Sequence, residues 1–398
     1  MGPVLAYLAD VTLFDGRVRR PRRGVLVEGD RIVWVGAHVR APRSAREARE
    51  LVRGMVVTPG LIDAHVHLCF DGTADFAAEA REMESVAAAT VKAVRNAAIT
   101  LRHGVTTVRD LGGRGDAAIW VARAVESGRL PGPRILAAGR ALTVTGGHGH
   151  NVGLGREVDG PDDVRRAVRE EIRAGATVIK LMATGGVLTP GITADVAAFT
   201  PEELRAAVDE AHAWGRTVAA HAIGPTGIVR AVEAGVDSIE HGSMLTAEGA
   251  RLMAERGTYH VPTLSALVGM VDHADEIPAY AAEKATALVD RAREAFRRSI
   301  RAGVRIACGT DAGTPFNPHG SAPLEVVRMV EWGLPEVAAL RAATSVAAEL
   351  LRLPEVGVVA PGALADLCAY EADPLEDVRA ILAPVLVLKG GEPVGSVP

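Results

Sequence analysis

The sequence predicts an α/β protein, a (β/α)8 barrel with a small β-sandwich domain built from both chain termini. Three observations support this prediction. The chain has 398 residues, of which 48% are hydrophobic, so it can bury a large core. A unit of helix, glycine and short β-branched strand recurs from about residue 80 to 315. The two ends of the chain lack this unit and contain short strand-like stretches joined by turns instead.

The recurring unit is the strongest of these observations. In each copy, a glycine suited to the left-handed position that ends a helix precedes a near-continuously apolar strand. Copies occur at 101–110, 171–181, 211–221, 231–241, 253–263 and 299–311. Further strands within 55–68 and 133–140 bring the predicted total to that of a (β/α)8 barrel. A doubly wound open sheet is the alternative, but the strand count and the absence of a glycine-rich nucleotide fingerprint disfavour it.

The ends of the chain predict the second domain. Residues 4–35 and 365–394 contain β-branched runs separated by turn residues, which is typical of strands and hairpins. Two terminal β segments that flank a barrel most simply pair with each other. We therefore place the β-sandwich domain at 1–56 plus 357–398 and the barrel at 57–356.

Charge and cysteine content disfavour several classes of protein. The formal net charge is −5, so no nucleic-acid partner is predicted. The basic cluster near the N-terminus is expected in a solvated hairpin turn, and comprises Arg17, Arg19, Arg20, Arg22 and Arg23. Three widely spaced cysteines argue against a disulfide framework. Without a secretory leader or a long apolar window, we expect a cytoplasmic protein that does not contact a membrane.

Polar residues stand where several predicted strands end: His65, His67, Lys180, His221, His241 and Asp311. Active sites of (β/α)8 barrels lie at the carboxyl ends of the strands, so these side chains should converge. The two histidines of a His-x-His sequence lie on the same side of a strand. Paired imidazoles suit a metal such as Zn²⁺, and an aspartate can add an oxygen ligand.

Each of these residues has a simpler explanation when taken alone. An isolated His-x-His arises by chance, a single histidine is more often a hydrogen-bonded core residue, and Asp311 could cap a turn. Their common position decides between the two interpretations, because four of the 12 histidines fall at the ends of repeat-defined strands. We therefore predict a metal site.

Lys180 is unusual because only four of the 44 basic residues are lysines. A lysine within an apolar strand then requires an explanation. An ammonium group has donors only and cannot bind a metal. The alternative is a side chain whose stem packs in the protein while its head reaches solvent.

In this chain order, the residues at the strand ends resemble the metal ligands of the amidohydrolase superfamily, and the resemblance covers nearly the whole chain. Supporting segments at 106–113, 145–151, 179–191, 236–242 and 309–320 are similar to the prolidase-like and imidazolonepropionase-like subgroup.

The resemblance implies a site with two Zn²⁺ or similar divalent ions. Carboxylated Lys180 would bridge the two metals, with His65, His67 and Asp311 at one metal and His221 and His241 at the other. Such a bridge favours a binuclear site over the mononuclear deaminase branch, which lacks this lysine.

The resemblance also implies roles in catalysis. Asp311 would accept a proton from the attacking water and return it to the leaving nitrogen, and His148 would stabilise the oxyanion. For His148, the alternative is a purely structural place in a glycine-rich bend. His150, Tyr259 and His319 are weaker candidates for substrate contact.

The predicted function is hydrolysis of an amide bond in a dipeptide or N-acyl amino acid, as in Xaa-Pro dipeptidases, carboxypeptidases or ochratoxinase-like amidases. Ile223 departs from the prolidase-like pattern, where a Tyr or His is frequent, and leaves room for a more apolar amide. Lactam ring opening of the imidazolonepropionase type and a metal-free binding or assembly homologue are the alternatives. Related enzymes often assemble, so a homo-oligomer is also an open alternative.

Overall fold

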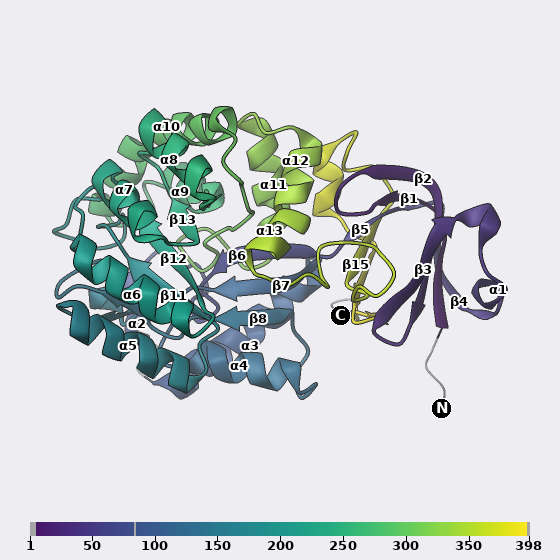
Figure 1. The fold of residues 1–398 in the computed structure, drawn as a ribbon, viewed down its shortest axis with the longest axis horizontal. Helices are drawn as coiled ribbons and strands as arrows, with labels where there is room; N and C mark the ends of the chain where they lie inside the picture. The colour runs from purple at the N-terminus through teal and green to yellow at the C-terminus, as the bar shows by residue number, and fades with distance from the viewer. Residues whose placement is uncertain (1–4, 83–84, 396–398) are drawn as a thin grey trace.

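The computed structural model describes residues 5–82 and 85–395. Two regions lie side by side (Figure 1). One is a β-sheet built from both ends of the chain, coloured purple and yellow. The other is a larger body in which parallel strands are surrounded by helices. This arrangement confirms the predicted α/β class.

The smaller region is one mixed sheet of eight strands in the order β17-β16-β15-β5-β1-β2-β3, with β4 on β1. The strands are β1 (Leu5–Phe14), β2 (Arg19–Glu28), β3 (Arg31–Ala37), β4 (Arg49–Arg53), β5 (Val56–Pro59), β15 (Leu367–Tyr370), β16 (Leu386–Lys389) and β17 (Glu392–Pro393). Antiparallel pairing of β5 with β15 joins the two ends of the chain. The sheet has its own apolar cluster, which includes Leu8, Val27, Ile32 and Leu367.

Only Arg17 of the basic cluster lies in a turn. The turn lies earlier, where Asp15 accepts backbone hydrogen bonds from Arg17 and Val18. The other arginines belong to β2, and Arg19 and Arg20 each pair with a carboxylate at 2.7 Å. The hydrogen bonds of Asp15 therefore place the turn before most of the arginines, and ion pairs with carboxylates allow Arg19 and Arg20 to lie in a strand.

The parallel strands form two sheets. One has the order β6-β7-β8 and the other β10-β9-β11-β12-β13-β14. Their bounds are β6 (Leu61–Val66), β7 (Val105–Asp110), β8 (Arg134–Ala137), β9 (Ala141–Thr143), β10 (Gly155–Glu157), β11 (Val178–Met182), β12 (Thr217–Ala222), β13 (Ser238–His241) and β14 (Tyr259–Val261). Every residue of β6, β7, β11 and β12 is buried, as predicted for strands covered on both faces.

Two of the predicted strands differ in the structure. The stretch 55–68 divides at Gly60 into β5 and β6, which belong to different sheets. The stretch 304–311 forms only an isolated parallel bridge, between Ile306 and His260. A Cβ at Gly309 would lie 2.4 Å from Val261, and Asp311 has a φ of 61°. This close approach and left-handed turn prevent a regular ladder.

Helices surround the parallel strands (Figure 1). They are α2 (Phe76–Glu82), α3 (Val86–Arg102), α4 (Ala117–Glu126), α5 (Pro161–Ala174), α6 (Pro201–Ala213), α7 (Pro225–Ala234), α8 (Ala247–Arg256), α9 (Leu264–Asp272), α10 (Ala279–Ala302), α11 (Ala322–Glu331), α12 (Glu336–Ala342) and α13 (Ser345–Leu350). Among the described helices, none has the length and apolar character needed to cross a membrane.

Local sequence explains where several helices begin and end. α6 starts with a capping box in which Thr200 and Glu203 bond each other's backbone N–H groups, followed by a proline in the first turn. α5 ends at Gly175, whose φ of 119° is unfavourable for other residues.

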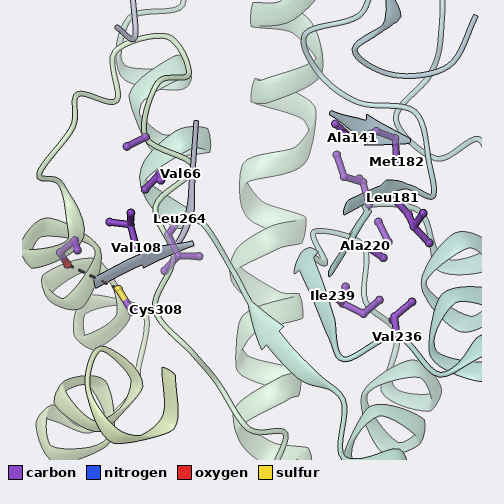
Figure 2. Close-up of a cluster of buried hydrophobic side chains, with 14 of the residues drawn as sticks. Val66, Val108, Ala141, Leu181, Met182, Ala220, Val236, Ile239, Leu264 and Cys308 are labelled. Carbon is purple, nitrogen blue, oxygen red and sulfur yellow. Dashed lines mark hydrogen bonds between the residues drawn. The ribbon is translucent and has the colours of Figure 1, made fainter. Parts of the chain in front are cut away.

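The main core lies between the parallel strands and the helices. In Figure 2, Leu181, Ala220 and Ile239 pack together from the neighbouring strands β11, β12 and β13. Cys308 packs near Val66 and Val108 as a small buried side chain, and all three cysteines are free and buried. This packing holds the carboxyl ends of the strands in fixed positions.

Candidate metal centre

All six predicted ligands line one cavity: His65, His67, Lys180, His221, His241 and Asp311. Four of them lie on parallel strands, whereas His67 directly follows β6 and Asp311 belongs to the irregular segment at 304–311. The imidazole rings form a continuous cluster. Ring centroids are 5.3 Å apart for His65 and His67, 5.2 Å for His65 and His241, and 4.6 Å for His221 and His241. The strand-end positions predicted from the sequence therefore meet in space.

His65, His67 and Asp311 form the first histidine group. The Nε2 atoms of His65 and His67 lie 3.2 and 3.1 Å from the same Asp311 oxygen, Oδ1. The Nδ1 of His67 donates to the carbonyl of Gly112 at 2.7 Å, and the Nδ1 of His65 donates to a carboxylate of Glu240 at 2.8 Å. In the neutral rings, both Nε2 atoms therefore carry lone pairs.

This geometry passes a chemical test for a metal site. Two nitrogen lone pairs and a carboxylate oxygen repel one another unless a proton or a metal cation lies between them. The three ligand atoms lie within 4.8 Å of one another, which suits a divalent ion. Without a metal, a proton can fill this gap: burial would raise the pKa of Asp311, but hydrogen bonds and charge interactions with His65 and His67 hold that pKa well below its usual range. Burial would lower the pKa of His67, but the Asp311 carboxylate raises it. Asp311 is therefore ionised and available as a ligand.

His221 and His241 form the second histidine group. The Nε2 of His221 donates to the carbonyl of Gly185 at 2.8 Å, which leaves a lone pair on its Nδ1. The Nδ1 of His241 hydrogen-bonds the Thr263 hydroxyl at 2.7 Å. Burial lowers the pKa of both histidines well below the usual value, so both rings are neutral at pH 7. Neutral imidazole is the form that binds metals.

Lys180 lies beside the first histidine group and lines the same cavity as the second. It is 1% exposed, and its Nζ is 3.4 Å from Nε2 of His65. The alternative of a head group in solvent is therefore wrong. Glu240 and Asp311 attract the ammonium from a distance, but burial is the stronger effect and lowers the pKa of Lys180 to about 8. A substantial fraction of this amine is therefore neutral in mildly alkaline solution.

Glu240 and Arg109 are functional candidates that the sequence reasoning missed. Glu240 accepts from His65 with one oxygen and from Arg109 with the other, at 2.8 and 2.9 Å. Burial opposes ionisation of Glu240, but Arg109 and His65 hold its pKa below the usual value. A carboxylate behind a ligand histidine fixes its tautomer and orientation. The signal in the sequence was a charged residue one position before the end of each strand, Arg109 in β7 and Glu240 in β13.

His148 lies in the same cavity, on the loop between β9 and the short helix η2 (His150–Val152). Its ring centroid is 4.5 Å from that of His221, and its Nδ1 is 2.7 Å from the hydroxyl of Thr189. Burial lowers the pKa of His148 to about 3, so the ring is neutral. The ring packs against Gly186, where a Cβ would lie 2.4 Å from Nε2.

The other rim candidates differ in position. Ile223 lines the cavity, whereas His150, Tyr259 and His319 are not among its lining residues. The ring of His150 bonds the carbonyl of Gly147, the hydroxyl of Tyr259 accepts from Arg305, and His319 donates to the carbonyl of Phe70. The polar groups of His150 and Tyr259 are therefore engaged within the protein, whereas the buried Nδ1 of His319 has no hydrogen-bond partner among the described residues.

Comparisons with known proteins agree with this geometry. The amidohydrolase family model matches residues 56–394. Ochratoxinase from Aspergillus niger is 34% identical over 405 residues, covering 93% of this chain and 82% of that protein. Imidazolonepropionase from Cereibacter sphaeroides is 28% identical over 401 residues, covering 93% of both chains.

Solved structures give the same result. The crystal structure of a Xaa-Pro dipeptidase with methionine bound in its active site is 34% identical, with a TM-score of 0.89 over 98% of this chain and 99% of the other. The predicted resemblance is thus confirmed, and this chain belongs to the amidohydrolase family as a metal-dependent hydrolase.

Proposed function

We propose that this protein hydrolyses an amide bond in a dipeptide or N-acyl amino acid, using two Zn²⁺ or similar divalent ions. The observation that carries this proposal is the pair of Nε2 lone pairs facing one Asp311 oxygen beside the buried Lys180. The similarity to an ochratoxinase and a Xaa-Pro dipeptidase supports the choice of substrate class.

The proposed ligands divide between the two metals. His65, His67 and Asp311 would hold one ion, and His221 and His241 would hold the other. Lys180, after its neutral amine adds CO₂ and releases a proton, would supply a carbamate as an anionic ligand to both. A buried lysine whose pKa is about 8 is suited to this reaction, since only the neutral amine adds CO₂.

When bound, the metals would activate a water molecule and polarise the substrate carbonyl. Asp311 would accept the proton of the attacking water at its carboxylate and pass it to the leaving nitrogen. His148, neutral and facing the cavity, would donate from Nε2 to the developing oxyanion while Thr189 donates to its Nδ1. Glu240 would hold His65 in its ligating orientation.

We also infer that the parallel strands close into a (β/α)8 barrel over 57–356, beside a β-sandwich of 1–56 plus 357–398. Backbone hydrogen bonds support the closure. Thr177 N–H donates to Ala137 O at 2.9 Å between the two parallel sheets, and Ala64 N–H donates to Cys308 O at 2.8 Å across the irregular segment. The sheet built from both chain ends has its own apolar cluster, which supports a separate β-sandwich domain.

The test combines metal analysis with an assay. Protein loaded with Zn²⁺ and bicarbonate is offered dipeptides, N-acyl amino acids and small lactams, and the release of free amine is measured with and without a chelator. Chelator-sensitive release with two metals per chain is expected. Hydrolysis of lactams alone would favour the imidazolonepropionase type, and absence of bound metal would contradict the proposal.

A further inference from the structure

The cavity beyond the histidines has an apolar wall. This wall contains Val187, Leu188, Ile223, Leu267, Met270 and Trp332. Its members come from four separate parts of the chain: the loop after β11, the end of β12, the helix α9 and the end of α11. Since these side chains lie far apart in the sequence, the apolar wall is a property of the assembled cavity.

Among the described residues, the cavity lining offers a substrate no charged side chain outside the proposed metal ligands. Its charged lining residues are Lys180 and Asp311, and both belong to the proposed ligand set. Its remaining polar lining residues outside the histidines are uncharged hydroxyl groups: Thr189, Ser243, Thr263 and Thr314. Three of these hydroxyls bond other protein groups: His148, His241 and a backbone carbonyl.

A further lysine lies close behind the wall but is already occupied. The ammonium of Lys284 on α10 donates to the carbonyls of Gly186, Thr189 and Ile192 at 3.2, 2.7 and 2.7 Å. An ammonium has three donors, so these bonds use all of them. Lys284 therefore anchors the loop that carries Val187 and Leu188 and is not available to a substrate carboxylate.

A free dipeptide would meet this cavity with an ionised group on either side of the scissile bond. An ammonium or carboxylate that leaves water without a partner is strongly disfavoured, whereas an apolar group is favoured. We propose that the substrate group occupying this cavity is uncharged and apolar, so that the enzyme acts on a capped amide such as an N-acyl or N-aryl compound. This inference rests on the proposed amide hydrolysis and narrows its substrate class.

The test keeps one scissile bond and changes only the charge of its neighbours. The metal-loaded enzyme is assayed with Leu-Phe, its N-acetyl form, its C-terminal amide and the doubly capped compound. At least one capped form is expected to exceed the free dipeptide tenfold or more in kcat/KM. The inference is overturned if the free dipeptide is cleaved as well as every capped form, although chelator-sensitive cleavage would still support the proposed hydrolysis.

A charge placed in the wall gives a second measurement. Leu267→Lys should increase the relative kcat/KM for a carboxylate-bearing substrate at least tenfold, because the new ammonium pairs with it. Leu267→Met keeps the wall apolar and should preserve the order of substrates. An unchanged order in a folded Leu267→Lys protein would contradict the inference.

Binding separates the two proposals if no compound is hydrolysed. Affinities of the metal-loaded protein for naphthylacetamide, naphthylacetate and naphthylmethylammonium are compared by calorimetry. The neutral amide should bind at least tenfold more tightly than either ion. Equal binding of an ion, or no binding of the neutral amide, would overturn the inference regardless of turnover.

Discussion

The two histidine groups of the candidate metal centre have different electrostatic surroundings. In the first group, His65 and His67 face the carboxylate of Asp311, and Glu240 stands behind His65. In the second group, His221 and His241 are held by a backbone carbonyl and a hydroxyl. The first group is therefore anionic, and the second consists of neutral ligands.

Because of this difference, we expect Lys180 to supply the negative charge that the second group lacks. A divalent cation bound only by neutral imidazoles lacks a compensating negative charge, whereas the first group provides one with Asp311. A carbamate on Lys180 would bring an anionic ligand to both groups. We therefore expect the second metal to depend on Lys180 more strongly than the first.

Removing the charge of the first group should have the largest effect. Asp311→Asn keeps the side-chain shape but deletes the carboxylate, so turnover should fall roughly 10²–10⁴-fold from the lost proton transfer alone. Metal content of the first group should also decrease. Steady-state kinetics and metal analysis on a variant with an unchanged circular dichroism spectrum provide the check. A loss of only a few-fold would assign the base to another residue.

Removing the Lys180 amine should affect metal binding at the second histidine group more than at the first. Lys180→Met should lose the second metal and most of the activity, and CO₂-rich medium should restore neither. Lys389→Met is a matched control, because that ammonium pairs with Asp366 in the terminal sheet. Elemental analysis should find two metals per chain in the control. Full activity of Lys180→Met would refute the carbamate.

Replacing Glu240, which hydrogen-bonds His65, should lower both the metal affinity and the free energy of unfolding. Glu240→Gln should weaken metal binding roughly 10–100-fold, since the carboxylate no longer orients the imidazole. It also leaves Arg109 buried without its ion pair, which costs on the order of 3–5 kcal/mol.

Glu171→Gln is the control for this variant. Glu171 is also a buried carboxylate paired with an arginine, Arg140, but it lies outside the cavity. Metal titration and denaturant unfolding should therefore show lower stability in both variants and weaker metal binding only in Glu240→Gln. Equal metal affinity in the two proteins would refute the role of Glu240.

A smaller loss of activity is expected from a variant that displaces His148, the ring next to His221. Gly186→Ala places a methyl group against the ring of His148 and moves it away from the substrate. Turnover should fall by up to roughly 10²-fold, the effect of losing one oxyanion donor, with both metals retained. His148→Ala should lose turnover to at least the same extent. Loss of metal in either variant would instead make His148 a support of the ligands.

The smallest expected effect is on the rate of assembly. Because burial lowers the pKa of Lys180 to about 8, its neutral amine increases about 10-fold between pH 7 and pH 9. Reactivation of metal-free protein by Zn²⁺ at constant dissolved CO₂ should therefore accelerate with rising pH and level off above pH 8. Stopped reactivation samples assayed over time provide the measurement. A midpoint near pH 10 would indicate an unperturbed lysine.

Much of the fold was predictable because it repeats. Five of the described parallel strands follow a helix-ending glycine, and this local pattern predicted the positions of β7, β11, β12, β13 and β14. The irregular segment at 304–311 was not predictable. Its departure from a regular strand arises from contacts of Gly309 with Val261 and His65, which belong to distant parts of the sequence.

The sequence by itself determined which residues stand at the strand ends, because strand periodicity and the recurring glycine depend on neighbours in the chain. It therefore identified the histidines, Lys180 and Asp311 as one set. Only the tertiary structure decided which imidazole nitrogen faces the cavity, since the partner that fixes His65 is Glu240, 175 positions away. The same holds for the apolar wall, whose charge-free surface exists only where separate loops and helices meet.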